Sequence, residues 1–489
     1  MSMNFPLNID KESSVPLFLQ IARSLQERID SGVLSKGLKL PSTYSLSEDL
    51  KISRATVVKA YEDLLSQGYL ESRAGGGTYV SGRVLAQADF FERFSDSQIS
   101  EPAYFSEFSQ RILSLSNSST ECASAVDNEK VNFGAPPIDS LPLKTWKRIL
   151  TQECNELGSR SVDWSPDDFG LYTCREAISQ YLSRSRAIKC SPEQVLIFAN
   201  CKESLMFVSR ILLNPGDVVA IENPSYNDPR NYFSSCGATL VPIDIDNEGM
   251  IVSELFKLKS KPKLVYTTPV QDPTGIKLTY TRKQDLVEWA EKNEVLIWEE
   301  GWEGDYNYVS PVDPALQALG SGANVFYGYC FWKLLYPLVT LGVLIVPPQL
   351  VYLCRKAKQF ADIQFSMLEQ KALARFISEG HLERHIKKSK STFEKRRISA
   401  MEGLLSTLRD HIEIPKQSAS LHLCIRFSEV FEKENILKSA ELAGLSITAT
   451  TPYYLQSPRT NEFLLPFSLH SEETLVNRIS KFSTYLKCK

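Results

Sequence analysis

One lysine stands in a segment made almost entirely of apolar and aromatic residues. Lys333 lies in FYGYCFWKLLYP, between a strand-like run and a proline. Burial in such surroundings disfavours the charged ammonium, lowers its pKa and leaves an amine that can attack a carbonyl to form an imine. The alternative is a structural lysine whose aliphatic stem is buried while its ammonium reaches water. The residues alone leave both interpretations open.

A second group, near the N-terminus, has residue types that bind nucleic acid. Ser53, Arg54, Thr56 and Lys59 fall at the start of a predicted helix. An arginine can donate two hydrogen bonds to guanine or contact a phosphate, and hydroxyl groups can bond phosphates or base edges. The alternative is a small helical interaction domain, in which these residues are only caps and solvated surface.

The elements around these residues predict a helix-turn-helix followed by a hairpin. Apolar residues recur every three or four positions from 17 to 29, and this helix ends at Ser31-Gly32. A second helix is predicted over 42–50. A third is predicted over 54–67, with Ser53 as its N-cap and Gly68 at its end. The segment YLESRAGGGTYVS then predicts a hairpin of the wing type, which carries Arg73 and Gly77 near its tip.

From residue 131 onward, the chain has a different pattern of apolar and polar residues. The apolar blocks VLIFA, VVAIE, KLVYTT, VLIWEE, VFYGY and GVLIV are each followed by a helical pattern, which predicts a largely parallel sheet covered by helices. Residues 82–130 are polar and serine-rich, and are interpreted as a linker with one helix near 105–115. The predicted domains are therefore 14–81, 82–130 and 131–489.

Length and composition restrict the class of protein. A chain of 489 residues is expected to form more than one domain, and its net charge of −3 does not mark a nucleic-acid binder. Residues 1–80 hold nine Lys and Arg against nine Asp and Glu, so DNA contact must come from the placement of cations. The ten cysteines lack the spacing of a metal site, and none is predicted.

One uncharged stretch, 334–354, is long enough to span a bilayer. Prolines at 337, 347 and 348 interrupt it, and LGVLIV is typical of a strand buried on both faces. The N-terminus also lacks the basic and apolar blocks of a signal peptide. A cytoplasmic protein without a membrane span is therefore expected.

The N-terminal segments PLFLQI, SGVLSKGLKLPS and LKISRATVVKAYEDLLSQGYLESRAGGGTYV resemble the GntR-type winged helix over its whole length. The resemblance implies binding to double-stranded DNA. One departure stands at Tyr44, where the family usually carries an arginine, and it affects the expected operator preference. The implied DNA-binding residues are Ser42, Tyr44, Ser53, Arg54, Thr56, Lys59, Arg73 and Gly77.

Further along, GLYTCREAISQYL, NPGDVVAIENPSY, TTPVQDPTG and EGHLERHIKKSKSTFEKRR resemble class I aminotransferases. More closely, they resemble the aminotransferase-like half of MocR-type regulators, which join such a domain to a GntR-type winged helix through a linker. The resemblance implies an α/β domain of fold type I with a small C-terminal subdomain. It also implies a homodimer and a site for pyridoxal 5'-phosphate.

The residues at the ring end of that site can be compared with the family one at a time. Lys333 falls where the family has its Schiff-base lysine, and Tyr226 where an aromatic residue stacks on the cofactor ring. Glu300 stands for the aspartate that pairs with the pyridine nitrogen, and Trp302 for a tyrosine that bonds the ring oxygen. Asp272 replaces the usual asparagine or aromatic residue before Pro-Thr-Gly.

The phosphate end departs further. Asn200 replaces the glycine of the phosphate loop, Trp332 a serine or threonine, and Thr340 the arginine that grips the phosphate. Lys202 is a candidate replacement charge. Leu464 lies near where the arginine for a substrate carboxylate is expected.

These departures predict a partly degraded cofactor site. Each missing charge-assisted hydrogen bond weakens binding by about 1.5–3 kcal/mol, so two of them weaken it by about 3–6 kcal/mol. We therefore expect a DNA-binding regulator whose aminotransferase-like half dimerises and senses an effector such as an amino acid or a vitamin B6 derivative, without efficient transamination. Two alternatives remain: a pyridoxal-phosphate-dependent aminotransferase with an accessory DNA-binding arm, and a cofactor-free scaffold.

Overall fold

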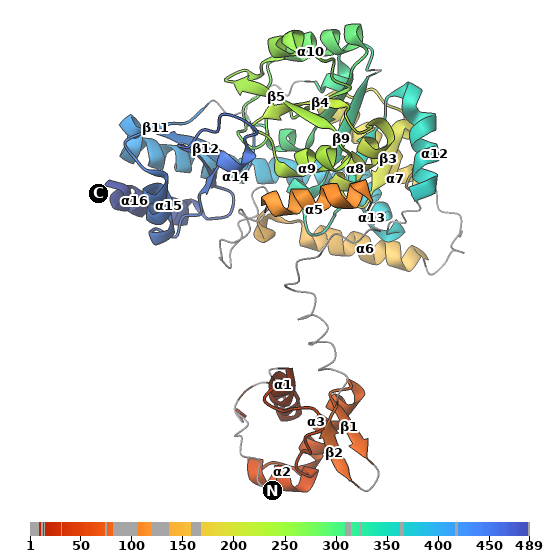
Figure 1. The fold of residues 1–489 in the computed structure, drawn as a ribbon, viewed down its shortest axis with the longest axis vertical. Helices are drawn as coiled ribbons and strands as arrows, with labels where there is room; N and C mark the ends of the chain where they lie inside the picture. The colour runs from red at the N-terminus through yellow and green to blue at the C-terminus, as the bar shows by residue number, and fades with distance from the viewer. Residues whose placement is uncertain are drawn as a thin grey trace. The chain divides into compact units, whose positions relative to one another are not determined.

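The computed structural model describes residues 9–10, 13, 15–30, 32–73, 76–81, 106–119, 136–157, 168–308, 314–322, 324–361, 366–415 and 419–487. The chain forms two compact units, one within residues 1–104 and one within residues 105–489 (Figure 1).

The small unit contains the predicted helices. They are α1 (Leu17–Asp30), α2 (Thr43–Leu50) and α3 (Arg54–Ser66). The apolar stripe of α1 packs on α3, so that Ile21 and Leu25 are buried beside Val57 and Leu64 in one core. The turn between α2 and α3 passes through Lys51, whose φ of 52° is left-handed.

A two-stranded wing completes this unit. Strands β1 (Leu70–Arg73) and β2 (Gly77–Val80) pair in antiparallel register, and Lys39 forms a further bridge to Tyr79. Leu70 and Val80 are buried in the same core as the helices, which fixes the base of the hairpin. Gly77 has a φ of +107°, a conformation that other residues rarely adopt. The winged helix-turn-helix predicted from the sequence is confirmed.

The large unit is built on an eight-stranded sheet in the order β3-β10-β9-β8-β7-β4-β5-β6. The strands from β9 to β5 are all parallel, whereas β10 runs antiparallel to both neighbours and β6 runs antiparallel to β5. The strands are β3 (Val195–Phe198), β4 (Val218–Asn223), β5 (Thr239–Asp246), β6 (Gly249–Met250), β7 (Leu264–Thr267), β8 (Leu296–Glu300), β9 (Val325–Cys330) and β10 (Gly342–Ile345). The largely parallel sheet predicted from the apolar blocks is confirmed.

Alternate residues of the strands enter different cores. Ile197 and Val343 pack into one apolar cluster, whereas their neighbours Phe198 and Leu344 pack into another. Because side chains alternate across a strand, both faces of the sheet must be covered. The covering helices are α6 (Leu143–Leu157), α7 (Tyr172–Arg186), α8 (Cys201–Leu212), α9 (Asn227–Ser235), α10 (Tyr280–Asn293), α11 (Trp332–Leu335), α12 (Val351–Ala361) and α13 (Met367–Ser378).

A further helix, α5 (Glu107–Ser119), lies within the segment interpreted as a linker. The Nε atom of Arg111 donates a hydrogen bond to the carbonyl oxygen of Ser235 at 3.0 Å, and the guanidinium of Arg210 lies 5.5 Å from the centre of the Phe108 ring. This helix therefore packs on α8 and α9 of the large unit (Figure 1).

The C-terminal part forms the predicted small subdomain. A four-stranded antiparallel sheet in the order β11-β12-β14-β13 packs with three helices. These elements are α14 (His381–Leu408), β11 (Ile412–Glu413), β12 (His422–Phe427), α15 (Lys433–Leu442), β13 (Thr448–Ala449), β14 (Glu462–Pro466) and α16 (Glu472–Lys487). Among the residues described, no helix is long and apolar enough to cross a membrane. The uncharged stretch 334–354, whose length would allow it to span a bilayer, contains the buried strand β10.

Candidate functional site

Two serines fix the starts of the helices that would face DNA. The Oγ atom of Ser42 accepts a hydrogen bond from the backbone N–H of Ser45 at 3.1 Å, as the N-cap of α2. Ser53 caps α3 in the same way: its Oγ atom accepts from the N–H of Thr56 at 3.2 Å and lies 2.7 Å from the Thr56 hydroxyl. Both hydrogen bonds are exposed, so the two hydroxyls can also meet a DNA phosphate.

The cationic side chains that are expected to contact DNA differ in the interactions that they already make within the small unit. The Nζ atom of Lys59 lies 4.1 Å from the centre of the Phe18 ring. The Nη2 atom of Arg73 donates a hydrogen bond to Oε1 of Glu71 at 2.6 Å, and the guanidinium lies over the ring of Tyr79. Arg54 is exposed, and no described residue pairs with it. DNA contact by Lys59 or Arg73 has to compete with these internal interactions, whereas DNA contact by Arg54 does not.

The other two residues assigned to the interface are also accessible. Tyr44, in the first turn of α2, is 63% exposed, which is unusual for a large aromatic side chain in a folded unit. Gly77 is exposed at the start of the second wing strand. Their contact with DNA stays a prediction.

In the large unit, a cavity of about 600 Å³ opens at one edge of the sheet. It is lined by Asn200 after β3, Tyr226 after β4, Asp272 after β7, Glu300 at the end of β8 and Lys333 after β9. These strands all end on the same edge because they run in the same direction. Ligands of α/β proteins commonly bind at the carboxyl ends of such strands.

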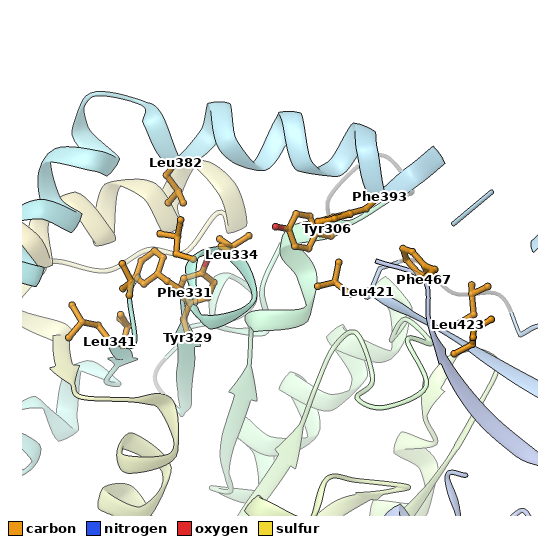
Figure 2. Close-up of a cluster of buried hydrophobic side chains, with 14 of the residues drawn as sticks. Tyr306, Tyr329, Phe331, Leu334, Leu341, Leu382, Phe393, Leu421, Leu423 and Phe467 are labelled. Carbon is orange, nitrogen blue, oxygen red and sulfur yellow. The ribbon is translucent and has the colours of Figure 1, made fainter. Parts of the chain in front are cut away.

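Lys333 is held inside this cavity by its own short helix. Figure 2 shows Phe331 and Leu334, which flank the tryptophan-lysine pair in the sequence, within the apolar cluster that also contains Leu382 of α14. Lys333 is 4% exposed, and its Nζ atom lies 3.8 Å from Oδ2 of Asp272. Burial lowers the pKa of the Lys333 amine, and the carboxylate of Asp272 opposes that shift. Burial in turn raises the pKa of Asp272.

The two buried carboxyl groups of the cavity, Asp272 and Glu300, each keep one oxygen without a described partner. Within the described ranges, Oδ1 of Asp272 and Oε1 of Glu300 are buried and accept no hydrogen bond. The other oxygen of Glu300 accepts from Nε1 of Trp298 at 2.9 Å. Burial raises the pKa of Glu300 to about 7, and the bond from Trp298 opposes that rise. Unpaired buried oxygens are costly, so both are suited to accept hydrogen bonds from a ligand.

Aromatic side chains form much of the remaining wall. Trp332 and Tyr336 pack together with ring centres 5.2 Å apart, and Tyr226 packs against Tyr453 at 5.1 Å. Tyr266, at 3% exposure, also lines the cavity. Sequence reasoning missed Tyr266 because it lies inside the strand-like run KLVYTT, where an aromatic residue is expected in the core.

The end of the cavity near α8 lacks a free cation among the residues described. Asn200 is the N-cap of α8, and its Oδ1 atom accepts from the N–H of Glu203 at 2.9 Å. Lys202 forms an ion pair with Asp228, with Nζ and Oδ2 2.6 Å apart. Trp332 and Thr340 complete this wall, and no arginine is among the residues that line the described cavity. The described lining therefore offers aromatic walls, a buried amine and two unpaired carboxyl oxygens, but near α8 its one cation, Lys202, is already paired with Asp228.

The structure does not bring the last two residues named from the sequence into the cavity lining that it describes. Trp302 begins the short helix η5 (Trp302–Tyr306), and the position of its side chain lies outside what the structure describes. Leu464 is buried in β14, opposite Cys424 of β12.

A histidine that sequence reasoning did not single out ties the C-terminal subdomain to this site. The Nε2 atom of His422 donates to the carbonyl oxygen of Pro273 at 2.5 Å, directly after Asp272. Burial, together with the charge of Lys333, lowers the pKa of His422 to about 4. The only sequence signal was a lone polar residue in the apolar strand LHLCI, which is more often structural than functional.

Comparisons with known proteins match two parts of the chain to two different families. The family of bacterial regulatory proteins called gntR matches residues 17–80, and aminotransferase class I and II matches residues 128–298. The probable rhizopine catabolism regulatory protein MocR of Rhizobium meliloti is 28% identical over 94% of this chain and 92% of that protein. The pyridoxine biosynthesis transcriptional regulator PdxR of Corynebacterium glutamicum is 25% identical over 96% of this chain and 95% of that protein.

A solved structure extends the comparison to the fold. The kynurenine aminotransferase of Pyrococcus horikoshii superposes with a TM-score of 0.68 over 82% of this chain and 98% of that protein, at 22% identity. The chain thus joins a GntR-type winged helix to a domain with the class I and II aminotransferase fold. That is the architecture of the MocR-type regulators, and the relatives named as transcription regulators are similar to this chain over almost its whole length.

Proposed function

We propose that this regulator binds DNA as a homodimer in the cytoplasm, and that its aminotransferase-like unit joins the two chains and senses a small molecule. The dimer would place two winged helices on two half-sites of one operator, which raises affinity through effective concentration.

The observation that carries the DNA-binding half of this proposal is the start of α3. Ser53 fixes the first turn, and Arg54 projects from it exposed and without a described partner. In a helix-turn-helix, this turn is the part that enters the major groove. The arginine can thus bind a guanine or a phosphate without first breaking an internal interaction.

For the large unit, we propose an effector site without efficient transamination. Pyridoxal 5'-phosphate would attach through Lys333, with Tyr226, Asp272 and Glu300 around its ring. The wall formed by Trp332 and Thr340, in which Lys202 is already paired with Asp228, supports weak binding of the phosphate.

The second candidate, an aminotransferase with an accessory DNA-binding arm, is favoured by one observation. Lys333 is a buried amine beside a carboxylate in a cavity of suitable size. The absence of a free cation from the described lining near α8 argues against it, because charge-assisted hydrogen bonds to phosphate are among the strong ones.

Selection of random duplex DNA by the full-length chain tests the proposal. We expect enrichment of sequences with two related half-sites, and loss of that enrichment in Arg54→Ala. If the full-length chain enriches no DNA sequence, the regulator function is refuted. In a parallel assay, conversion of added pyridoxal phosphate to its amine form by a common amino acid would favour the enzyme instead.

A further inference from the structure

The ionisable groups of the cavity do not suit a dianionic ligand. Its described lining contains two lysines, Lys202 and Lys333, and three carboxyl groups, Asp228, Asp272 and Glu300. Carboxyl groups therefore outnumber cations, and the buried Asp272 and Glu300 would each repel a phosphate whenever they are ionised.

Neither lysine is placed to offset that repulsion. The ammonium of Lys202 is bound by Asp228 at 2.6 Å. The ammonium of Lys333 lies beside Asp272, at the end of the cavity where the ring of pyridoxal phosphate would bind. At the start of α8, the side chain of Asn200 already accepts one of the free backbone N–H groups. A phosphate bound near α8 would thus have to share the ammonium of Lys202 with the carboxylate of Asp228.

The remaining features of the cavity define a different ligand. A buried amine forms an imine with an aldehyde, and the unpaired oxygens of Asp272 and Glu300 require donors. The tyrosine and tryptophan walls suit a flat ring. We propose that this cavity binds an aromatic aldehyde that carries a hydrogen-bond donor and no phosphate group, and that it holds this ligand as an imine on Lys333. The inference rests on the proposed function, since it names the class of effector.

The covalent step needs no further reactant. The unprotonated amine of Lys333 attacks the aldehyde carbon and forms the carbon–nitrogen bond. The two amine hydrogens then leave with the carbonyl oxygen as one molecule of water, and the carbon–nitrogen double bond remains. Asp272, 3.8 Å from Nζ, is placed to carry a proton during this exchange. No electron donor or acceptor is involved.

Titration of the full-length chain with two matched aldehydes tests this inference. One is 5-deoxypyridoxal, which has a free aldehyde and the pyridine ring but no phosphate, and the other is pyridoxal 5'-phosphate. The visible imine band reports binding, and borohydride reduction followed by peptide mass mapping reports the lysine modified. We expect 5-deoxypyridoxal to bind at least about 10-fold more tightly, because it carries no phosphate that would lose its hydrating water without gaining a charged partner of its own.

Three variants make the result specific. Lys333→Ala should abolish the band and the mapped adduct, whereas Lys387→Ala, at an exposed position of α14, should leave both unchanged. Trp332→Ser combined with Thr340→Arg should reverse the preference, because it returns space and a guanidinium to the wall near α8. Equal or tighter binding of pyridoxal phosphate by the unaltered chain would overturn the inference. So would the absence of an adduct on Lys333.

Operator binding by the same preparation separates this inference from the proposed function. If the chain selects DNA but forms no imine with 5-deoxypyridoxal, the ligand class is wrong and the regulator function stands. If the imine forms on Lys333 but the chain selects no DNA, the ligand class stands and the regulator function is refuted.

Discussion

At the scale of single residues, Arg54 is the side chain whose contribution to DNA binding can be isolated most cleanly. Arg54→Ala should weaken binding to a selected operator by about 1–3 kcal/mol if the arginine reads a guanine. Because no described residue pairs with it, the winged helix should keep its stability. Fluorescence anisotropy against the selected duplex measures the change. Arg23→Ala, an exposed arginine on α1, is the matched control, and equal losses of affinity in both variants would remove Arg54 from base recognition.

We expect Glu300 to make the stability of the folded chain depend on pH. Burial raises its pKa in the folded chain to about 7, from an ordinary value of 4.5. The folded chain thus retains a proton that the unfolded chain loses as pH rises through that interval. Stability therefore falls with rising pH up to about 7 and is then unaffected by this group.

Glu300→Gln should remove this dependence. Between pH 6 and pH 8 the unaltered chain should lose about 1 kcal/mol of unfolding free energy through Glu300, and the variant should not. Urea unfolding followed by tryptophan fluorescence measures the difference. Glu288→Gln, at an exposed position on α10, is the control. The same slope in all three proteins would mean that Glu300 is ionised in the folded state.

Sequence reasoning was able to name the residues of the cavity but not their pairings. Lys333 was singled out because it interrupts an apolar run, and Asp272 because it departs from the residue that the resembling family usually has before Pro-Thr-Gly. Their approach to 3.8 Å depends on the positions of two strands and could not be derived from spacing. Lys202 was expected as a partner for phosphate, and only the structure places Asp228 against it, because α9 brings that carboxylate from a separate part of the chain.

At the scale of elements, six of the eight strands of the large sheet were predictable. Six uninterrupted apolar blocks predicted strands, and all six form strands of the large sheet, because burial on both faces requires apolar residues at every position. The direction of β10 was not predicted. An apolar block looks the same in either direction, and the antiparallel pairing follows only from how the chain returns after α11.

A close approach between β10 and α8 positions the cavity wall. A side chain added at Gly342 would collide with the backbone carbonyl of Asn200, and backbone cannot move aside as a flexible side chain can. Gly342→Ala should therefore destabilise the large unit by about 3 kcal/mol and displace the start of α8. Thermal unfolding measures the decrease in stability.

The control for this variant is a glycine with room around it. Gly403 lies within α14, and its nearest neighbour for an added carbon is a side-chain atom of Ile479 at 3.4 Å. Gly403→Ala should leave stability unchanged or raise it by up to about 1 kcal/mol, because alanine favours the helix. Equal melting temperatures for the two variants would show that β10 and α8 can separate without cost.

At the scale of the whole molecule, the two compact units imply separate functions, with DNA binding in the small unit and dimerisation in the large one. The small unit has its own core, in which Ile21, Leu25, Val57 and Leu64 are fully buried, so it should fold without the large unit. The large unit is the proposed source of dimerisation. Affinity for an operator with two half-sites should then depend on the connection between the units rather than on the winged helix alone.

A fragment of residues 1–104 tests this division. We expect it to be folded and monomeric, and to bind a selected operator about 10²–10⁴-fold more weakly than the full chain, since each half-site must then be bound independently. Sedimentation gives the oligomeric state, circular dichroism the fold and anisotropy the affinity. Fusion of the fragment to an unrelated parallel coiled-coil dimer is the decisive control, because it restores the connection without the aminotransferase-like unit. If the fused fragment regains most of the affinity, the large unit contributes to DNA binding by joining two chains. If the unfused fragment is dimeric with full affinity, the dimer surface lies in the small unit, and the role proposed for the large one is wrong.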